Sequence, residues 1–154
     1  MARGSRWAAL GLPAACAALG GCATPKLLCL RPDGVQSVTI HSSSQANGGV
    51  PVAVDLVFVT QKPPAQTISK LTASDYYLGD SRNQLERDNP DAVKIHYWEL
   101  PAGYTIKTQV KPPCNIVKTF IFASYASNGP HRVELTKAKQ VTVELGTDDF
   151  TTRQ

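Results

Sequence analysis

The chain has 154 residues, a length typical of a single domain. It contains 16 Lys and Arg against 12 Asp and Glu, which gives a formal net charge of +4. No basic run interleaves with aromatic residues, so nucleic-acid binding is not expected. Beyond the N-terminal region, no stretch is long and apolar enough to cross a membrane.

The first 21 residues have the pattern of an export signal. Arg3 and Arg6 form a positively charged start, and an apolar stretch follows from Trp7 to Leu19. That stretch is too short to span a bilayer as a stable helix, and small residues precede Cys22. We therefore predict a cleaved signal peptide over residues 1–21. Without it the chain keeps 14 basic and 12 acidic residues, a nearly neutral balance.

The Leu-Gly-Gly-Cys sequence that ends at Cys22 resembles the bacterial lipobox. In a lipobox the cysteine thiol takes a diacylglyceryl group, cleavage falls just before it, and the new amino group is acylated. The resemblance implies a covalent lipid on Cys22, with Ala23 similar to the outer-membrane sorting class. Two or three acyl chains would hold the protein at a membrane, whereas one binds weakly. Cys16 fits the pattern less well, and an ordinary secretory signal that ends near a cysteine is the alternative.

Two further cysteines, Cys29 and Cys114, would remain in the exported chain. An oxidising compartment favours a disulfide between them, with two separate buried thiols as the alternative. The bridge would close a long loop and stabilise the fold by about 4–5 kcal/mol on the chain-entropy account. Residues 22–34 would form an acylated tether that precedes a domain over residues 35–154.

Alternating apolar and polar residues predict about seven strands in that domain. The stretches Val52–Thr60 and Ile116–Tyr125 are apolar on both faces, which is typical of central strands. Turn residues separate the strands, and the pattern predicts a β-sandwich. The predicted strands are Val35–His41, Val52–Thr60, Val93–Leu100, Tyr104–Val110, Ile116–Tyr125, a short one around Val133–Leu135, and Val141–Leu145.

Two stretches interrupt this pattern. The serine-rich residues 42–50 are polar and predict a loop between the first two strands. From about residue 65 to 89, polar helix formers replace β-branched residues and predict an insertion of short helices. Within it, Thr72 could cap a turn through residues 75–77, and Ser81–Asp88 could form another short helix.

Four segments, taken in order, resemble the outer-membrane lipoprotein family TssJ of the type VI secretion system. The resemblance covers most of residues 50–146 and implies a mostly β, transthyretin-like sandwich with a helical excursion after the second strand. It also implies a partner, the periplasmic part of the inner-membrane protein TssM. The segments are Val54–Val59, Leu71–Tyr77, Trp98–Gly103 and Phe120–Tyr125.

In this family the region between the first two strands meets TssM, so the resemblance implies contacts from residues 42–50 here. The tyrosine pair at residues 76 and 77 is a second candidate, because aromatic side chains carry much interface energy. Core packing is the alternative for both tyrosines. The expected partner-binding residues are Ser42, Ser43, Ser44, Gln45, Asn47, Tyr76 and Tyr77.

The sequence predicts neither a catalytic nor a metal site. The three histidines lie in or beside different predicted strands, without partners at metal-ligand spacing. Neither a Gly-x-Ser-x-Gly elbow nor a glycine-rich phosphate loop is present. Ser42 follows His41, but neighbours on a strand face opposite ways. Asp148 and Asp149 are expected to end a strand rather than bind calcium. Asp55, within an apolar strand, is expected to bond to a backbone amide or a basic side chain, or to lie at an edge.

We therefore expect a non-enzymatic lipoprotein on the periplasmic face of the outer membrane, without a cofactor other than its lipid. It would dock a TssM-like protein in a type VI secretion membrane complex. An assembly or pilotin-like lipoprotein of another envelope machine is one alternative. A small-ligand-binding or hydrolytic envelope lipoprotein is the other.

Overall fold

The structure is a computed structural model that describes residues 33–154. The predicted signal peptide, Cys22, Cys29 and most of the predicted tether lie outside these residues. Within them the chain forms eight strands, three α-helices and a short 3-10 turn. The elements are β1 (Ser37–Ser42), η1 (Ala46–Gly49), β2 (Val52–Val59), α1 (Lys62–Ile68), α2 (Ala73–Tyr77), α3 (Ser81–Asp88), β3 (Val93–Leu100), β4 (Thr105–Gln109), β5 (Lys118–Ala123), β6 (Arg132–Leu135), β7 (Gln140–Leu145) and β8 (Phe150–Arg153).

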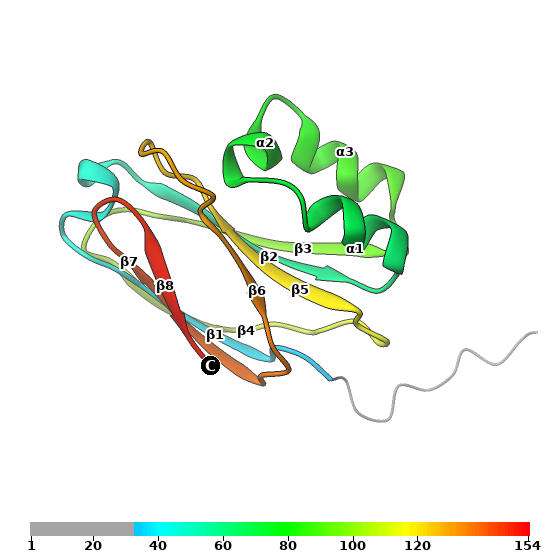
Figure 1. The fold of residues 1–154 in the computed structure, drawn as a ribbon. Coiled ribbons are helices and arrows are strands. Elements are labelled where there is room, and N and C mark those ends of the chain that lie inside the picture. The colour runs from blue at the N-terminus through cyan, green and yellow to red at the C-terminus, as the bar shows by residue number, and fades with distance from the viewer. Residues whose placement is uncertain (1–32) are drawn as a thin grey trace, which may run out of the picture.

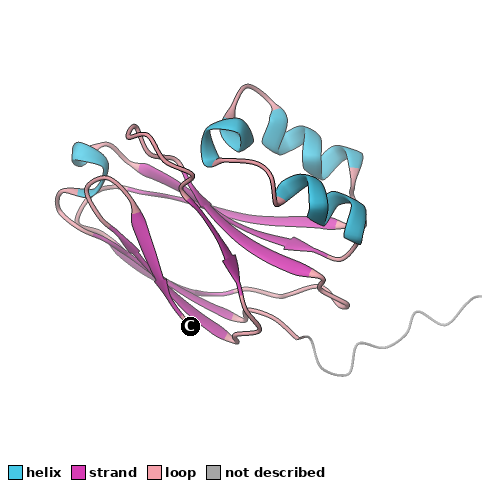
Figure 2. Cartoon of the chain, viewed as in Figure 1, coloured by secondary structure: helices cyan, strands magenta, loops and turns pink. Residues whose placement is uncertain are grey.

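The strands form two four-stranded sheets that pack face to face (Figures 1 and 2). One sheet has the order β4-β1-β7-β8 and the other has the order β3-β2-β5-β6. β1 and β7 run parallel, and every other pair of neighbouring strands in the two sheets is antiparallel. The predicted β-sandwich is therefore confirmed.

The main core fills the space between the two sheets. Alternate residues of β2 point into it, because successive side chains of a strand face opposite sides. Val54, Leu56 and Phe58 are fully buried there, together with Ile121 of β5 and Ile40 of β1. Large apolar side chains from both sheets thus close the sandwich, as the alternation in the sequence predicted.

The helical insertion covers the outer face of the second sheet and creates a second core (Figure 2). Val57 and Val59 of β2 and Phe120 and Phe122 of β5 point outward into this layer. They pack against buried residues of the helices, among them Ile68. The two central strands are therefore apolar on both faces because each face has its own core. Among the residues that the structure describes, no helix is long and apolar enough to cross a membrane.

The structure differs from the predicted element boundaries at two places and agrees with the predicted start of α2. Helix α1 begins at Lys62, with prolines in its first turn, because proline fits the start of a helix, where a free N–H is not needed. Thr72 caps α2 as predicted, in a reciprocal capping box with Asp75. The predicted count of about seven strands omitted β8, whose single apolar residue, Phe150, gives little alternation to detect.

Candidate docking surface

The first strand, β1, starts at one end of the sandwich and runs to the other end (Figure 1). We call one end the tether pole, formed by residues 33–36, 60–62, 110–117 and 136–139. We call the other end the loop pole, formed by the connections at residues 43–51, 101–104, 124–131 and 146–149. β1 starts at the tether pole and ends at the loop pole. The chain therefore enters the domain at the end opposite the connection predicted to contact a partner.

Hydrogen bonds join the connections of the loop pole. Ser43 N donates to Leu145 O at 3.0 Å, and Gly103 N donates to Ser43 O at 3.0 Å. Asn47 N donates to Gly146 O at 3.3 Å. These bonds tie the β1–β2 connection to both the β3–β4 and the β7–β8 turns. The serine-rich segment is therefore a braced surface rather than a free loop.

The predicted partner-binding residues of this segment divide into two groups. Ser43, Ser44 and Gln45 are exposed at the tip. Ser42 and Asn47 are buried, so the structure does not support direct contacts from these two side chains. Ser42 belongs to β1, where the strand alternation turns its side chain inward.

Asn47 has a structural role in the brace. Its backbone φ of +48° lies in the left-handed region, which asparagine tolerates better than most residues. Its side-chain Oδ1 accepts a hydrogen bond from Ala126 N at 2.9 Å. The side chain thereby connects the β1–β2 segment to the β5–β6 connection.

Two large apolar side chains beyond the polar tip are exposed at the same pole. Val50 is 57% exposed and Tyr104 is 62% exposed. Val50 ends the segment predicted to contact the partner. Tyr104 directly precedes β4, although the sequence pattern predicted it to begin that strand. They add apolar contact area beside the polar tip at residues 43–45.

The prediction of partner contacts from the tyrosine pair is not supported for Tyr76. Its side chain is fully buried, and its ring stacks on Phe122 with centroids 4.2 Å apart. Tyr77 is half-buried, and its hydroxyl donates to Ala53 O and Phe122 O, both at 3.3 Å. Both tyrosines attach α2 to the outer face of the sheet, which is the core-packing alternative.

Asp55 is the centre of this attachment. Its side chain is buried on the outer face of β2, and Tyr76 Oη donates to its Oδ2 at 2.8 Å. Arg82 of α3 forms an ion pair with the same oxygen, with Nε 2.5 Å away. The Arg82 guanidinium also lies 4.7 Å from the centre of the Tyr97 ring on β3. The expected basic partner of Asp55 is thus confirmed, and it joins a helix to two strands.

Burial governs the electrostatics of this cluster. It raises the pKa of the Asp55 carboxyl, while the Tyr76 hydroxyl and the Arg82 guanidinium oppose that rise. Burial also raises the pKa of Tyr76 and of Tyr77, and the nearby Asp55 carboxylate raises both further. The two hydroxyls therefore remain protonated donors. Because Asp55 is only 1% exposed, no substrate reaches its carboxylate, and the cluster serves the fold.

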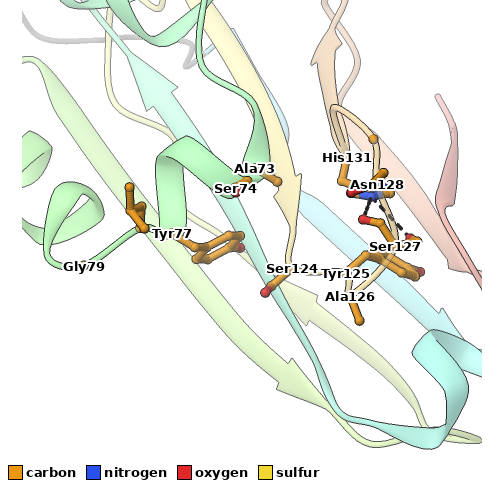
Figure 3. Close-up of a pocket in the computed structure, with 12 residues that line it drawn as sticks. Ala73, Ser74, Tyr77, Gly79, Ser124, Tyr125, Ala126, Ser127, Asn128 and His131 are labelled. Carbon is orange, nitrogen blue, oxygen red and sulfur yellow. Dashed lines mark hydrogen bonds between the residues drawn. The ribbon is translucent and has the colours of Figure 1, made fainter.

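A cleft of about 410 Å³ separates α2 and its following loop from the β5–β6 connection (Figure 3). Ala73, Ser74 and Tyr77 line one side, and Ser124, Tyr125 and other residues up to His131 line the other. Its lining contains no Lys, Arg, Asp or Glu. The cleft thus offers no charged group to orient an ionic ligand.

Ser127 and His131 of the cleft lining meet Asp149, which lies outside the lining, in an arrangement that the sequence did not predict. His131 Nδ1 lies 2.9 Å from Asp149 Oδ1, and Nε2 lies 2.8 Å from the carbonyl oxygen of Ser127. Ser127 Oγ is farther from Nε2, at 3.4 Å, and donates instead to Asp148 O at 2.5 Å. These three residues join the β5–β6 and β7–β8 connections.

This geometry does not match a nucleophile and its base. A general base needs a hydrogen-free nitrogen within reach of the hydroxyl. Both ring nitrogens of His131 instead face acceptor oxygens, so each makes a hydrogen bond only when it carries a hydrogen. His131 is also only 4% exposed. The arrangement is that of a structural brace at the loop pole.

The other histidines lie apart from this brace. His41 Nδ1 lies 3.0 Å from Thr105 Oγ1 on β4, so it does not pair with Ser42. His96 packs between the rings of Phe58 and Trp98. In the part of the chain that the structure describes, no group of three His, Cys, Asp or Glu residues could hold a metal ion.

Cys114 lies in the β4–β5 connection at the tether pole and is disulfide-bonded. It is the one cysteine between residues 33 and 154, so its partner lies outside the described residues. The predicted pairing of Cys114 with Cys29 stays a prediction. The bond nevertheless attaches the tether pole to a cysteine outside the described domain.

Comparison with known proteins identifies the fold. No protein-family model and no curated protein sequence matches the chain. Among solved structures, the type VI secretion lipoprotein TssJ1 from Pseudomonas aeruginosa matches with a TM-score of 0.59 and 13% identity, over 80% of this chain and 96% of that chain. A chain of a structure described as a type VI membrane complex matches with a TM-score of 0.60 and 12% identity, over 78% and 99% of the two chains.

A third match is a chain of a structure described as the type VI secretion protein TssM C-terminal domain from EAEC. Its TM-score is 0.57 at 15% identity, over 77% of this chain and 100% of that chain. In all three cases the match covers nearly the whole of the solved chain, although few residues are identical. The domain over residues 33–154 therefore has the β-sandwich fold of the TssJ lipoproteins.

Proposed function

We propose that this protein is a lipid-anchored component of a type VI secretion membrane complex and that its loop pole docks a TssM-like partner. The TssJ-like fold, with a braced loop pole opposite the N-terminal tether, carries this proposal. Three comparisons support it, because the matched structures are described as a type VI secretion lipoprotein, a type VI membrane complex and a TssM domain.

The proposed mechanism is tethering. A lipid on Cys22 would hold the chain at the periplasmic face of the outer membrane, without catalysis or a cofactor. Ten residues lie between Cys22 and Asp33, so the eleven Cα-to-Cα steps of a fully extended connection would span at most about 40 Å. The domain would therefore stay within that distance of the bilayer, and confinement would raise the effective concentration of its loop pole near the membrane.

The anchor is tested by the substitution Cys22→Ser in cells. The parent chain should pellet with the outer-membrane fraction, and the variant should be recovered in the soluble periplasmic fraction. Mass spectrometry of the parent should show an acylated N-terminal cysteine. A variant that still pellets with membranes would show that the anchor is misassigned.

Docking is tested with the exposed tip of the loop pole. The double substitution Ser44→Arg and Gln45→Arg adds two bulky charges, and we expect it to lower affinity for the periplasmic part of the TssM-like partner by at least tenfold in calorimetry. Gln66→Arg, an exposed change on α1, is the control for an arginine added away from the loop pole and should leave affinity unchanged. Equal binding by all three proteins would place the contact elsewhere, and co-purification with a secretin instead would support the pilotin-like alternative.

A further inference from the structure

The tether pole carries four exposed lysines: Lys62, Lys111, Lys137 and Lys139. None of them forms an ion pair with a described residue. Two other basic side chains are paired, Lys118 with Glu134 and Arg153 with Glu144. Lys94, at the start of β3, is exposed and adds a further positive charge near this end. The four lysines, which we call the lysine group, therefore leave their charge available to an outside partner.

Two members of the lysine group lie beside the residues through which the chain enters the domain. The carbonyl oxygen of Lys139 accepts hydrogen bonds from Gln36 N at 2.7 Å and Ser37 N at 3.1 Å. Lys111 follows Val110, whose N donates to Gln36 O at 2.9 Å. Both lysines are therefore fixed next to the start of β1, and the chain leads from there toward Cys22.

The other two members lie at the start of α1 and in the β6–β7 turn, which are at the same end of the sandwich (Figure 1). Lys62 begins α1, three residues after the end of β2, whose last residue pairs with the first residue of β5. Lys137 lies in the β6–β7 turn, where Ala138 N donates to Thr136 O at 2.8 Å. Three separate connections thus present the four lysines at one pole.

Charge is unequally distributed between the two poles. Residues 33–154 contain 12 basic and 12 acidic residues, so the described domain has no net charge. The connections of the loop pole contain Asp148 and Asp149 but no Lys or Arg. The tether pole contains the lysine group and one acid, Asp33, and the exposed Asp91 lies next to the pole, where its carbonyl oxygen accepts from Thr60. A neutral domain is therefore positive at the end nearest its proposed anchor.

We infer that the tether pole is a membrane-contact surface and that the lysine group binds the headgroups of anionic phospholipids. The inference rests on the proposed lipid anchor for its setting, since that anchor would hold this pole near the bilayer. Attraction to an anionic surface falls off within a Debye length of about 8 Å at physiological ionic strength. The pole must therefore touch the bilayer, which would point the loop pole away from it.

Vesicle binding by an unacylated chain tests this inference independently of the proposed lipid anchor. The mature chain with Cys22→Ser is mixed with vesicles of phosphatidylcholine alone or with one-third phosphatidylglycerol, at about 25 mM and about 200 mM salt. We expect sedimentation with the anionic vesicles at low salt, weaker binding at high salt, and little binding to the neutral vesicles. No difference between the two vesicle types would overturn the inference.

Two double variants that remove the same charge from different places test whether the position of the lysines matters. Lys137→Gln with Lys139→Gln should weaken binding about 25-fold, because each lysine near the surface contributes about fivefold. The matched control is Lys70→Gln with Lys107→Gln. Lys70 follows Ser69, whose carbonyl accepts from Arg132 at the loop-pole end of β6, and Lys107 lies in the middle of β4. The control should weaken binding less than twofold, and equal losses in both variants would overturn the inference.

Two further measurements complete the test. Both double variants should keep the thermal unfolding midpoint of the parent, because the four lysine side chains involved are exposed. Both should also keep full affinity for the TssM-like partner, since docking is assigned to the other pole. Loss of partner binding in the Lys137→Gln with Lys139→Gln variant would contradict the proposed docking surface. Unchanged vesicle binding with unchanged partner binding in that variant would contradict the membrane-contact surface alone.

Discussion

At the scale of single residues, the buried carboxylate of Asp55 decides how the helical insertion is held. A buried charge is tolerated only when hydrogen bonds and opposite charge compensate for its lost hydration. Tyr76 and Arg82 provide that compensation from two different helices. The cluster therefore makes the position of α2 and α3 on the sheet specific, where apolar packing alone would be less selective.

The substitution Tyr76→Phe tests this role. It keeps the ring that stacks on Phe122 and removes only the hydroxyl that donates to Asp55. We expect it to lower the free energy of unfolding by about 1–3 kcal/mol, measured by urea denaturation, because a buried acceptor loses its donor. Tyr104→Phe, at an exposed position, should change it by less than about 0.5 kcal/mol. Equal effects would contradict the importance of this hydrogen bond.

At the scale of elements, the three helices are too short to be stable by themselves. Isolated helices of fewer than about 12 residues are marginal in water, and α2 has five residues. The capping box of Thr72 and Asp75 stabilises its first turn, since Thr72 Oγ1 and N donate to Asp75 Oδ2 at 2.7 and 3.1 Å. These bonds lower the pKa of the Asp75 carboxyl. The local cap and the buried cluster therefore act together on α2.

The capping box predicts a pH dependence that Asp75→Asn should remove. Because the folded state lowers the pKa of Asp75, its contribution to stability is present above the unfolded-state pKa and is lost as the pH falls through the folded-state pKa. We expect the difference in unfolding free energy between parent and variant to be largest near pH 7 and to disappear in strong acid. Urea denaturation at a series of pH values measures it, and a constant difference would contradict the assignment.

At the scale of the whole molecule, the proposed attachment and the proposed recognition surface occupy opposite poles. The tether, the disulfide of Cys114 and the lysine group lie at one end, and the braced connections lie at the other. A rigid sandwich would hold the proposed docking surface at a fixed distance and orientation from the pole that faces the membrane.

Loss of the disulfide should lower the stability of the whole domain. We expect Cys114→Ser to reduce the free energy of unfolding by about 2–5 kcal/mol in non-reducing denaturation. Cys29→Ser should have the same effect, because acylation would occupy the thiol of Cys22 and cleavage would remove Cys16. If Cys29→Ser leaves stability unchanged while Cys114→Ser lowers it, the pairing is wrong, and peptide mapping by mass spectrometry would identify the true partner.

Local pattern in the sequence was sufficient for much of the architecture. The alternation along β2 predicted both of its buried faces, and Thr72 predicted the start of α2. The bounds of α3, Ser81–Asp88, and of β3, Val93–Leu100, agree with the prediction. Periodicity and capping depend on neighbours along the chain, so they can be read without knowing the tertiary structure.

The tertiary structure decided which predicted faces are covered. Tyr97 follows Ile95 on the outer face of β3, yet it is 69% exposed, because burial on this face ends where the helical layer ends. Tyr76 is buried because α2, which carries it, packs on the same sheet face and its ring stacks on Phe122. The meeting of Ser127, His131 and Asp149 and the collection of four lysines at one pole join residues from separate connections. Such groupings depend on how strands pair over long distances, which local sequence pattern does not contain.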